Sequence, residues 1–311
     1  MGSRVLHSYQ IMTTPTVDTR GVTPPPSGYF RRLQARLLRV WRRPGYTRQL
    51  WERRWFIREL AFGNIMGKHA TDTLGVLWWV LNPLMMTGVY FIVFGVILDG
   101  RRGDPAFLAY LLAGVFAMRF MSGTMNGSAK MITGGGKLVT TISFPRMVLP
   151  LAALIEAMTA FLVSLATFYF LVAPINNIWP TWWLLFFPVP LILHTMFVLG
   201  MGTLTARLVV PIRDFRNVIP HLTRMWFYLS PILWTLDRID GSGNAEAAAT
   251  WIQVIVKANP MFSFLSLYRT ALMGRPLEPI YIATGAAWAV VVMVFGIWTF
   301  VRNEGSMARY L

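Results

Sequence analysis

The residues of this chain that could do chemistry are charged side chains inside long apolar segments. Arg119 is the one charged residue of positions 105–129, and Glu156 is the one charged residue of positions 147–206. An ionised group inside a membrane costs several kcal/mol unless it is paired or hydrated. Each of these two residues is therefore expected to face a partner, water or a transported substrate.

Two interpretations of Arg119 stay open at this point. It lines a pathway and contacts substrate, or it forms a salt bridge with Glu156, the only acid of the next two apolar segments. Arg224 lies about two helical turns into its apolar segment, so its side chain can reach back to the membrane surface. His194 stands among apolar residues, where a histidine is more often packed and hydrogen-bonded than a proton relay.

The sequence lacks the residue patterns of a membrane enzyme. It has no HExxH motif, no paired carboxylates within an apolar segment and no Ser/His/Asp set at a common depth. The "GGGK" at 134–137 is not a phosphate-binding loop, because Met131 stands where glycine is required and Leu138 follows the lysine. The absence of cysteine excludes thiol nucleophiles and Cys-ligated metals. We expect no catalytic residue, no metal ligand and no cofactor bound by this chain.

Composition indicates what positions these charges. The 311 residues are 55% hydrophobic and 14% charged, with a mean hydropathy of +0.50. A soluble domain has roughly 25% charged residues, so the chain is predicted to be an all-α integral membrane protein. A bilayer core is spanned by about 20 apolar residues. Six such helices are predicted, at about 74–98, 106–129, 147–172, 181–206, 217–236 and 280–301.

The net charge of +16 is distributed unevenly. With six spans, 22 of the 29 Lys and Arg residues fall on one face of the membrane. The positive-inside rule therefore places both termini, including 303–311, in the cytoplasm and the protein in a plasma membrane. This placement favours attraction to anionic lipid over nucleic-acid binding.

Two segments precede the first span. Residues 1–28 are polar and rich in Thr and Pro without an early apolar core, so we predict a disordered cytoplasmic tail rather than a signal peptide. Residues 29–72 are basic, and 47–66 mixes Trp and Leu with Arg, which is typical of an interfacial amphipathic helix. The alternative is a helix that packs on another cytosolic protein, and both can hold.

The external segment 237–278 contains two short apolar runs, 251–258 and 261–273, on either side of Asn259-Pro260. Neither run is long enough to span, and proline separates them. We predict short helices that re-enter the outer leaflet, shielded by protein. The alternative is a pair of surface helices.

Aromatic residues are dense in the first two predicted spans. Their rings could stack on the C–H faces of sugars and form a track for a glycan. Lipid contact and interface anchoring explain any single ring equally well. These residues are Trp78, Trp79, Tyr90, Phe91, Phe94, Phe116 and Phe120.

Four motifs in order resemble those of a known family over about residues 50–302. They are "REL" (58–60) followed by "TLGVLWWVLNPLMM" (73–86), "ISFPRMVLPL" (142–151), "RDF" (213–215) followed by "SPI" (230–232), and "NPMFSFLSLYRTALMG" (259–274). The family comprises the Wzm-like membrane subunits of ABC-2 type exporters, which move lipid-linked polysaccharides, O-antigens and teichoic acids. Two features depart from its pattern: "AFGNIMGKHATD" (61–72) replaces a basic run, and Arg119 stands where many members carry a neutral residue.

The resemblance implies a homodimer with six spans per protomer, beneath which two copies of a separate ATPase bind ATP and Mg. It implies a glycan channel formed by spans one, two and five, with Trp78, Trp79, Tyr90, Phe116, Arg119, Phe120, Trp226 and Tyr228. It implies that loop 130–146 and the Arg-Asp motif contact the ATPase through Lys137, Phe144, Pro145, Arg146, Arg213 and Asp214. A gate helix at 51–66 would contain Trp51, Trp55, Arg58 and Glu59, and the re-entrant region would contain Asn259, Pro260 and Arg269.

The function that follows is a permease subunit that exports a lipid-linked cell-envelope polysaccharide across a bacterial inner membrane. Two alternatives remain at the level of sequence. An ABC-2 exporter of drugs or simple lipids would have a closed apolar cavity, and a non-transporting membrane scaffold would purify without an ATPase. The resemblance does not identify the polymer.

Overall fold

The structure is a computed structural model that describes residues 45–68, 73–97, 106–134, 144–175, 178–234 and 254–307. All regular secondary structure in these ranges is helical. The predicted tail 1–28, the loop residue Lys137 and the segment 235–253 lie outside the described residues. The predicted C-terminal segment 303–311 is described as far as 307.

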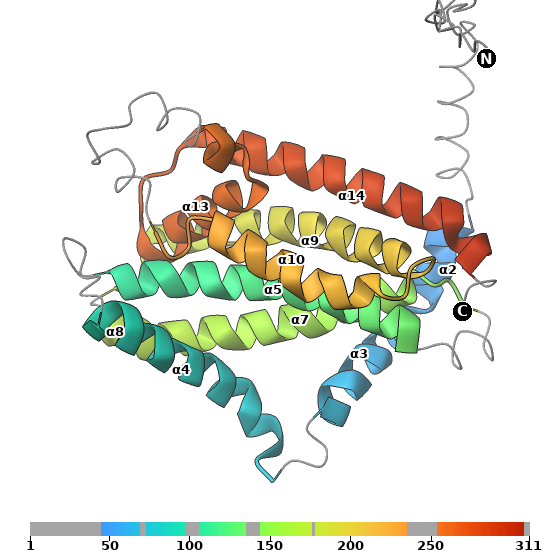
Figure 1. Cartoon of the computed structure of the whole chain (residues 1–311). Helices are drawn as coiled ribbons and strands as arrows, with labels where there is room; N and C mark the ends of the chain where they lie inside the picture. Colours follow the sequence, from blue (N-terminus) through green and yellow to red (C-terminus); the bar gives the residue numbers. More distant parts are fainter. Residues whose placement is uncertain are drawn as a thin grey trace, which may run out of the picture. The chain divides into compact units, whose positions relative to one another are not determined.

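Four helices are long and apolar enough to cross a bilayer (Figure 1). They are α5 (Phe107–Gly134), α7 (Val148–Thr167), α9 (Pro188–Val209) and α14 (Pro279–Met307). Short helical segments extend the middle two: η3 (Phe168–Val172) and α8 (Ala173–Ile175) follow α7, and η4 (Trp182–Phe186) precedes α9. These helices correspond to the second, third, fourth and sixth predicted spans.

The first predicted span is helical but broken into pieces. A 3-10 turn, η1 (Gly75–Leu77), leads into α4 (Trp78–Tyr90), which continues as the π-helical η2 (Phe91–Ile97). Pro83 lies inside α4 and cannot donate the backbone hydrogen bond of a regular helix. The change of helix type follows from hydrogen bonding, which a hydropathy pattern does not register.

The fifth predicted span is shorter than expected. Helix α10 (Phe215–Leu229) has 15 residues, about 22 Å at the rise of an α-helix, whereas a bilayer core is about 30 Å thick. The helix ends at Ser230, whose backbone is extended (φ −91°, ψ 145°). Ser230 precedes Pro231, and a residue before proline is sterically driven out of the helical region. Four of the six predicted spans are therefore helices that are long and apolar enough to cross a bilayer.

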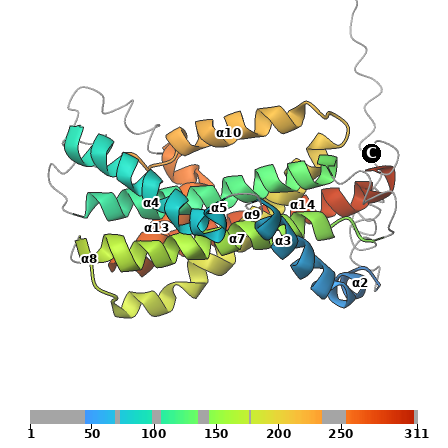
Figure 2. The ribbon, with the colours of Figure 1, turned by 90° about the horizontal axis from the view of Figure 1, so that it is seen from below.

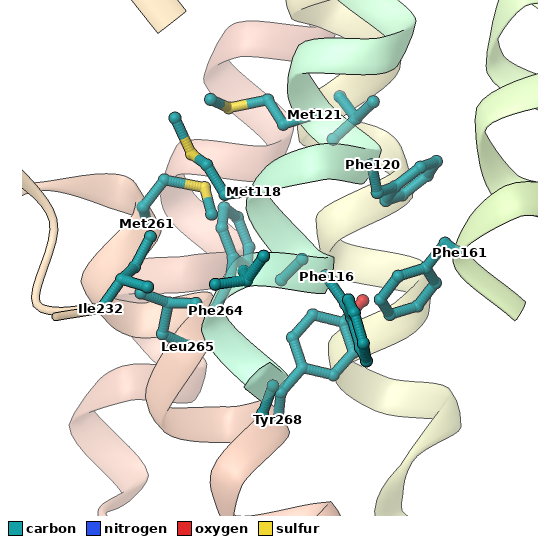
Figure 3. Packing of buried hydrophobic residues seen from close by; sticks show 14 of the residues in the cluster. Phe116, Met118, Phe120, Met121, Phe161, Ile232, Met261, Phe264, Leu265 and Tyr268 are labelled. Atoms are coloured by element: carbon teal, nitrogen blue, oxygen red, sulfur yellow. The ribbon is translucent and has the colours of Figure 1, made fainter. Parts of the chain in front are cut away.

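Helix α5 is the central element of the described bundle. It packs against α7, α9, α10 and α13, and Figure 2 shows α10 along one of its sides and α7 along another. The core between these helices is rich in aromatic side chains (Figure 3). Phe120 stacks on Phe161 with ring centroids 5.4 Å apart, and Phe161 packs on Tyr268 at 5.5 Å.

Helices α9 and α14 lie side by side and approach each other closely through glycine. A Cβ atom on Gly200 would lie 2.4 Å from the carbonyl oxygen of Val292, and one on Gly296 would lie 2.4 Å from the carbonyl oxygen of Gly200. Small residues allow membrane helices to pack backbone to backbone. The pair is therefore held by close van der Waals contact.

Three further helices complete the described chain. Helices α2 (Tyr46–Glu52) and α3 (Arg54–Lys68) precede the first span, and α3 packs on α7. Helix α13 (Pro260–Met273) is buried along most of its length and contacts α5, α9 and α14. Its burial argues against the surface-helix interpretation of 261–273. Of the preceding run, 254–258 is helical, and 251–253 lies outside the described residues.

Candidate functional site

A row of polar side chains runs along one face of α5. Arg119, Ser122, Asn126 and Lys130 follow each other at intervals of three or four residues, which places them on the same helix face. All four are exposed or half-buried, while most other residues of this helix are buried. The sequence therefore supplies one hydrophilic face to an otherwise apolar bundle.

This face borders a cavity of about 410 Å³ that lies between α5 and α7 and is lined also by α4. Its polar lining residues are Lys68, Asn82, Arg119, Ser122, Asn126, Glu156 and Ser164. Phe116, Phe120 and Phe161 contribute aromatic surface to the same wall. The cavity therefore combines hydrogen-bonding groups, charges of both signs and ring faces.

Arg119 and Glu156 both line this cavity, but they are not paired. The carboxylate of Glu156 forms an ion pair with Lys68, at the end of α3. Within the ranges that the structure describes, no ion pair joins Arg119 to Glu156. The salt-bridge interpretation of Arg119 is thus wrong for this conformation, because Lys68 already occupies the carboxylate.

Three of the predicted channel residues, Tyr90, Arg119 and Tyr228, lie near one another. Tyr90 of α4 lies near both Arg119 of α5 and Tyr228 of α10. Tyr228 is exposed and Tyr90 is half-buried. Three helices, corresponding to the first, second and fifth predicted spans, therefore converge on one polar region.

The other predicted channel residues are arranged differently. Phe116 and Phe120 are buried in the core while they line the cavity. Trp226 is half-buried, and its indole N–H donates to Asn259 Oδ1 at 2.9 Å. This hydrogen bond joins α10 to the residue that begins α13. Trp78 is half-buried, and the side chain of Trp79 lies outside the described part of the chain.

His194 is fully buried, as expected of a packed histidine. Its Nδ1 lies 3.3 Å from the hydroxyl oxygen of Tyr268. Its ring stacks on Phe264 at 4.9 Å and meets the edge of Phe120 at 5.2 Å. This environment is that of a core residue.

The gate helix predicted at 51–66 is divided between the end of α2, which contains Trp51, and α3, and both parts expose aromatic and cationic side chains. Trp51 and Trp55 are 69% and 57% exposed, and the Arg58 guanidinium lies 4.5 Å from the Trp55 ring centroid. Arg58 also contacts Glu59 at 3.5 Å. On the other side of the helix, Ile57 is buried in a cluster with α7 residues. Exposed tryptophan beside arginine suits a membrane interface.

The motif before α7 joins the gate helix to the end of α14. The Phe144 ring meets the edge of Phe56 at a centroid distance of 5.5 Å. The backbone N–H of Arg146 donates to Glu304 Oε1 at 2.6 Å, and its guanidinium donates to the Glu304 carbonyl. Pro145 between them is buried. This predicted coupling motif is therefore a junction of three elements.

Tyr46 of α2 lies at the same junction. Its side chain packs with Met147 and Phe300 in a small buried cluster. Burial raises the pKa of the Tyr46 hydroxyl well above its usual value, and the nearby Glu304 carboxylate raises it further. The hydroxyl therefore stays protonated at physiological pH.

Arg213 and Asp214 are exposed just before α10, where Asp214 occupies the N-cap position. Next to them, the guanidinium of Arg216 donates to Thr133 Oγ1 at 3.4 Å, near the end of α5. The start of α10 and the end of α5 therefore lie together.

Asn259 forms a polar cluster with the Ser-Pro-Ile turn. Its Oδ1 accepts from the Met261 backbone N–H at 3.0 Å and from Trp226, and its Nδ2 donates to Ser230 Oγ at 3.1 Å. Asn259 thus caps α13 and ties it to α10. Pro260 occupies the first helical turn, where the missing backbone N–H of proline costs no hydrogen bond within the helix.

Arg269 is 5% exposed and reaches the same turn from α13. Its Nη2 donates to the Pro231 carbonyl at 2.7 Å, and its guanidinium lies 3.3 Å from the ring centroid of Tyr110. The Tyr110 hydroxyl donates to the Pro231 carbonyl at 3.3 Å. The re-entrant residues predicted from sequence therefore meet the Ser-Pro-Ile motif directly.

Sequence reasoning missed Lys68 and Tyr110. Lys68 was counted only as one basic residue of the segment before the first span. Its partner Glu156 lies 88 positions away, so no local spacing signals the pair. In the described residues, no group of three or more His, Asp or Glu side chains could hold a metal ion.

These features first define a class. The chain is a multi-pass helical membrane protein, because four of its described helices are long and apolar enough to cross a bilayer. The chain is similar to the O-antigen export system permease protein RfbA of Myxococcus xanthus, with 28% identity over 223 residues, 72% of this chain and 82% of the relative. Two proteins of that name from Klebsiella pneumoniae share 23% identity over 247 residues and 22% over 244, with 78% of this chain and 90% of each relative covered.

No family model matches the chain. The relatives nevertheless confirm the resemblance drawn from the four motifs, since they align over most of its length. Over most of its length the chain is therefore similar to permeases of O-antigen export systems, as expected for an ABC-2 type permease.

Proposed function

We propose that this chain is the membrane subunit of an ABC exporter that carries a lipid-linked cell-envelope polysaccharide across the bacterial inner membrane. A separate ATPase subunit would bind ATP and Mg and supply the energy. Support comes from relatives named as permeases of O-antigen export systems. It comes also from the polar and aromatic face of α5.

The polar row on α5 carries this proposal. A glycan presents hydroxyl groups and apolar C–H faces, so a path for it needs hydrogen-bonding side chains and ring faces together. Arg119, Ser122 and Asn126 supply the first, and Phe116 and Phe120 supply the second. A cavity for drugs or simple lipids would need walls that are apolar throughout, whereas Arg119, Ser122 and Asn126 place polar groups along this one.

In the proposed topology, two shorter elements complete six spans. The η1–α4–η2 segment would form the first span, and α10 with the turn after it would form the fifth. Both would line the channel, since Tyr90 lies near both Arg119 and Tyr228. Both termini would lie in the cytoplasm, and two copies of the chain would enclose the channel.

The ATPase would dock at the cytoplasmic end formed by loop 130–146 and the start of α10. The contacts of Phe144 with Phe56 and of Arg146 with Glu304 give this loop a physical connection to the gate helix and to α14. A displacement of the loop would therefore reach the gate helix. Two ATPase copies per dimer are expected.

Depletion of this protein in its native cells tests the proposal. Surface polysaccharide should fall while lipid-linked glycan accumulates inside, and the intact gene should restore both. Purification in mild detergent should recover the chain with an ATPase subunit. Normal surface polysaccharide combined with loss of drug efflux would overturn the substrate, and purification without any ATPase would favour a scaffold.

A further inference from the structure

Two cavities lie end to end along α5 and α7. The central cavity is the one already described, with a volume of about 410 Å³. The terminal cavity, of about 500 Å³, lies beside α3 and the end of α5 at Gly134. Lys68 and Glu156 are the two residues that line both cavities. Their ion pair therefore stands where one cavity ends and the other begins.

The order of lining residues along the helices supports this placement. On α5, the central cavity is lined as far as Asn126, and the terminal cavity begins at Gly127. On α7, Glu156 belongs to both cavities, and Ser164 belongs to the central one alone. The two cavities are consecutive sections of one groove.

The last turns of α3 are held more loosely than the turns before them. Ile57 and Ala61 are buried against α7. Further along the same helix, Gly63 and Gly67 line the terminal cavity, and a Cβ atom on either would meet nothing within 4 Å. Lys68 therefore crosses an open space to reach its partner.

The two partners are unequally exposed. The Lys68 side chain is 59% exposed, whereas that of Glu156 is 12% exposed. A buried carboxylate that loses its only cation is strongly destabilised, so it requires a replacement. Arg119 lines the same cavity as Glu156 and forms no ion pair within the described ranges. Lys68 can move into water, and Arg119 can then take its place.

We propose that the Lys68–Glu156 ion pair is a gate between the two cavities. In the closed state, Lys68 binds Glu156 and separates the cavities. In the open state, the end of α3 moves away from α7, Glu156 turns to Arg119, and the groove becomes continuous. The proposal rests on the proposed function, in which this groove belongs to the substrate path.

Cysteine labelling tests the gate, because the chain has no cysteine of its own. Ser164→Cys places one thiol in the central cavity, and Gly134→Cys on α5 places one in the terminal cavity as a matched control. Full-length protein in inside-out vesicles is treated with a membrane-impermeant maleimide. Lys68→Ala should raise the labelling rate of Ser164→Cys several-fold and leave that of Gly134→Cys unchanged.

Charge-conserving variants separate the gate from a general loss of structure. Lys68→Arg should keep the labelling of Ser164→Cys slow, and so should the exchange of Lys68→Glu with Glu156→Lys. Loss of a nearby cation would by itself disfavour the reactive thiolate and slow labelling. A faster reaction in Lys68→Ala therefore reports access.

Equal labelling of Ser164→Cys in the parent and in Lys68→Ala would overturn the gate, as would fast labelling in Lys68→Arg. The readout needs no glycan and no export. A gate that behaves as expected in a protein that exports no polysaccharide would overturn the proposed function alone.

Discussion

Arg269 donates a hydrogen bond from Nη2 to the carbonyl oxygen of Pro231 at 2.7 Å, across 38 positions of sequence. This contact joins two of the four family motifs, the Ser-Pro-Ile turn after α10 and the buried helix α13. Asn259 joins the same motifs through Ser230 at 3.1 Å. The motifs are thus two halves of one polar cluster, which fixes how α10 ends against α13.

We expect Arg269→Ala to destabilise the protein. It removes a charge-assisted hydrogen bond and a cation–π contact with Tyr110, and it leaves the Pro231 carbonyl with one donor fewer. Such hydrogen bonds contribute about 1.5–3 kcal/mol, so unfolding in detergent should become easier by about 2 kcal/mol. The stability of Arg269→Lys should lie between that of the parent and that of Arg269→Ala, because lysine keeps the charge without the planar guanidinium.

The matched control for Arg269 is Lys257→Ala, an exposed cation of the same region. It should leave the melting temperature unchanged. If Arg269→Ala unfolds like the Lys257 variant, the hydrogen bond to Pro231 is not a stabilising contact.

The close crossing of α9 and α14 gives a second prediction. A Cβ atom on Gly296 would overlap the Gly200 carbonyl at 2.4 Å and Thr203 Oγ1 at 2.6 Å. Gly296→Ala should therefore separate the two helices and lower the yield and melting temperature of folded protein. Size-exclusion chromatography with thermal unfolding measures both.

Gly285 provides the control on the same helix. Its added Cβ would meet Phe264 at 3.5 Å, an ordinary van der Waals distance. Gly285→Ala should fold normally. If the two alanine variants behave alike, backbone contact between α9 and α14 is not what limits stability.

Much of the fold could be predicted because it depends on local patterns. Long apolar runs identify four spans, and asparagine, proline and Gly274 mark the two ends of α13 through capping preferences. The early end of α10 depends on steric restriction before Pro231, and the change from α- to π-helix at Phe91 is a change in backbone hydrogen bonding. Hydropathy records neither effect.

The site was predictable only where one residue was anomalous by itself. Arg119 stands out because an arginine inside an apolar segment is costly, and it does line the cavity. The pairing of Glu156 with Lys68 could not be predicted from the sequence, since it joins residues that lie 88 positions apart. Trp226 was expected in the channel, yet its polar N–H is used to hold Asn259.

The ring contact between Phe144 and Phe56 predicts how the ATPase loop acts. Phe144→Ala with Arg146→Ala should leave basal ATP hydrolysis intact and abolish its stimulation by substrate, because the loop loses its ring contact with the gate helix and the guanidinium hydrogen bond to the Glu304 carbonyl. Hydrolysis by the reconstituted complex is the measurement. Phe62→Ala, at an exposed aromatic residue of the same gate helix, should stay coupled. Full stimulation in the double variant would rule out this loop as the coupling element.

Arg119 gives the last prediction, which concerns transport itself. Its guanidinium lies in the central cavity and forms no ion pair within the described ranges, so it is available to hydroxyl or phosphate oxygens of the cargo. Loss of one charge-assisted hydrogen bond costs about 1.5–3 kcal/mol, and 1.4 kcal/mol corresponds to about tenfold. Arg119→Ala should therefore reduce export about tenfold or more, with assembly and ATP binding intact.

Vesicle export assays that compare Arg119→Ala, Arg119→Lys and Arg302→Ala test this role. Arg302 is an exposed cation of α14, and its removal should leave export unchanged. The lysine variant should export at an intermediate rate, because it keeps the charge but not the fork of donors. Normal export by Arg119→Ala would show that the cargo does not depend on this cation, and the polar row on α5 would then act through its neutral side chains alone.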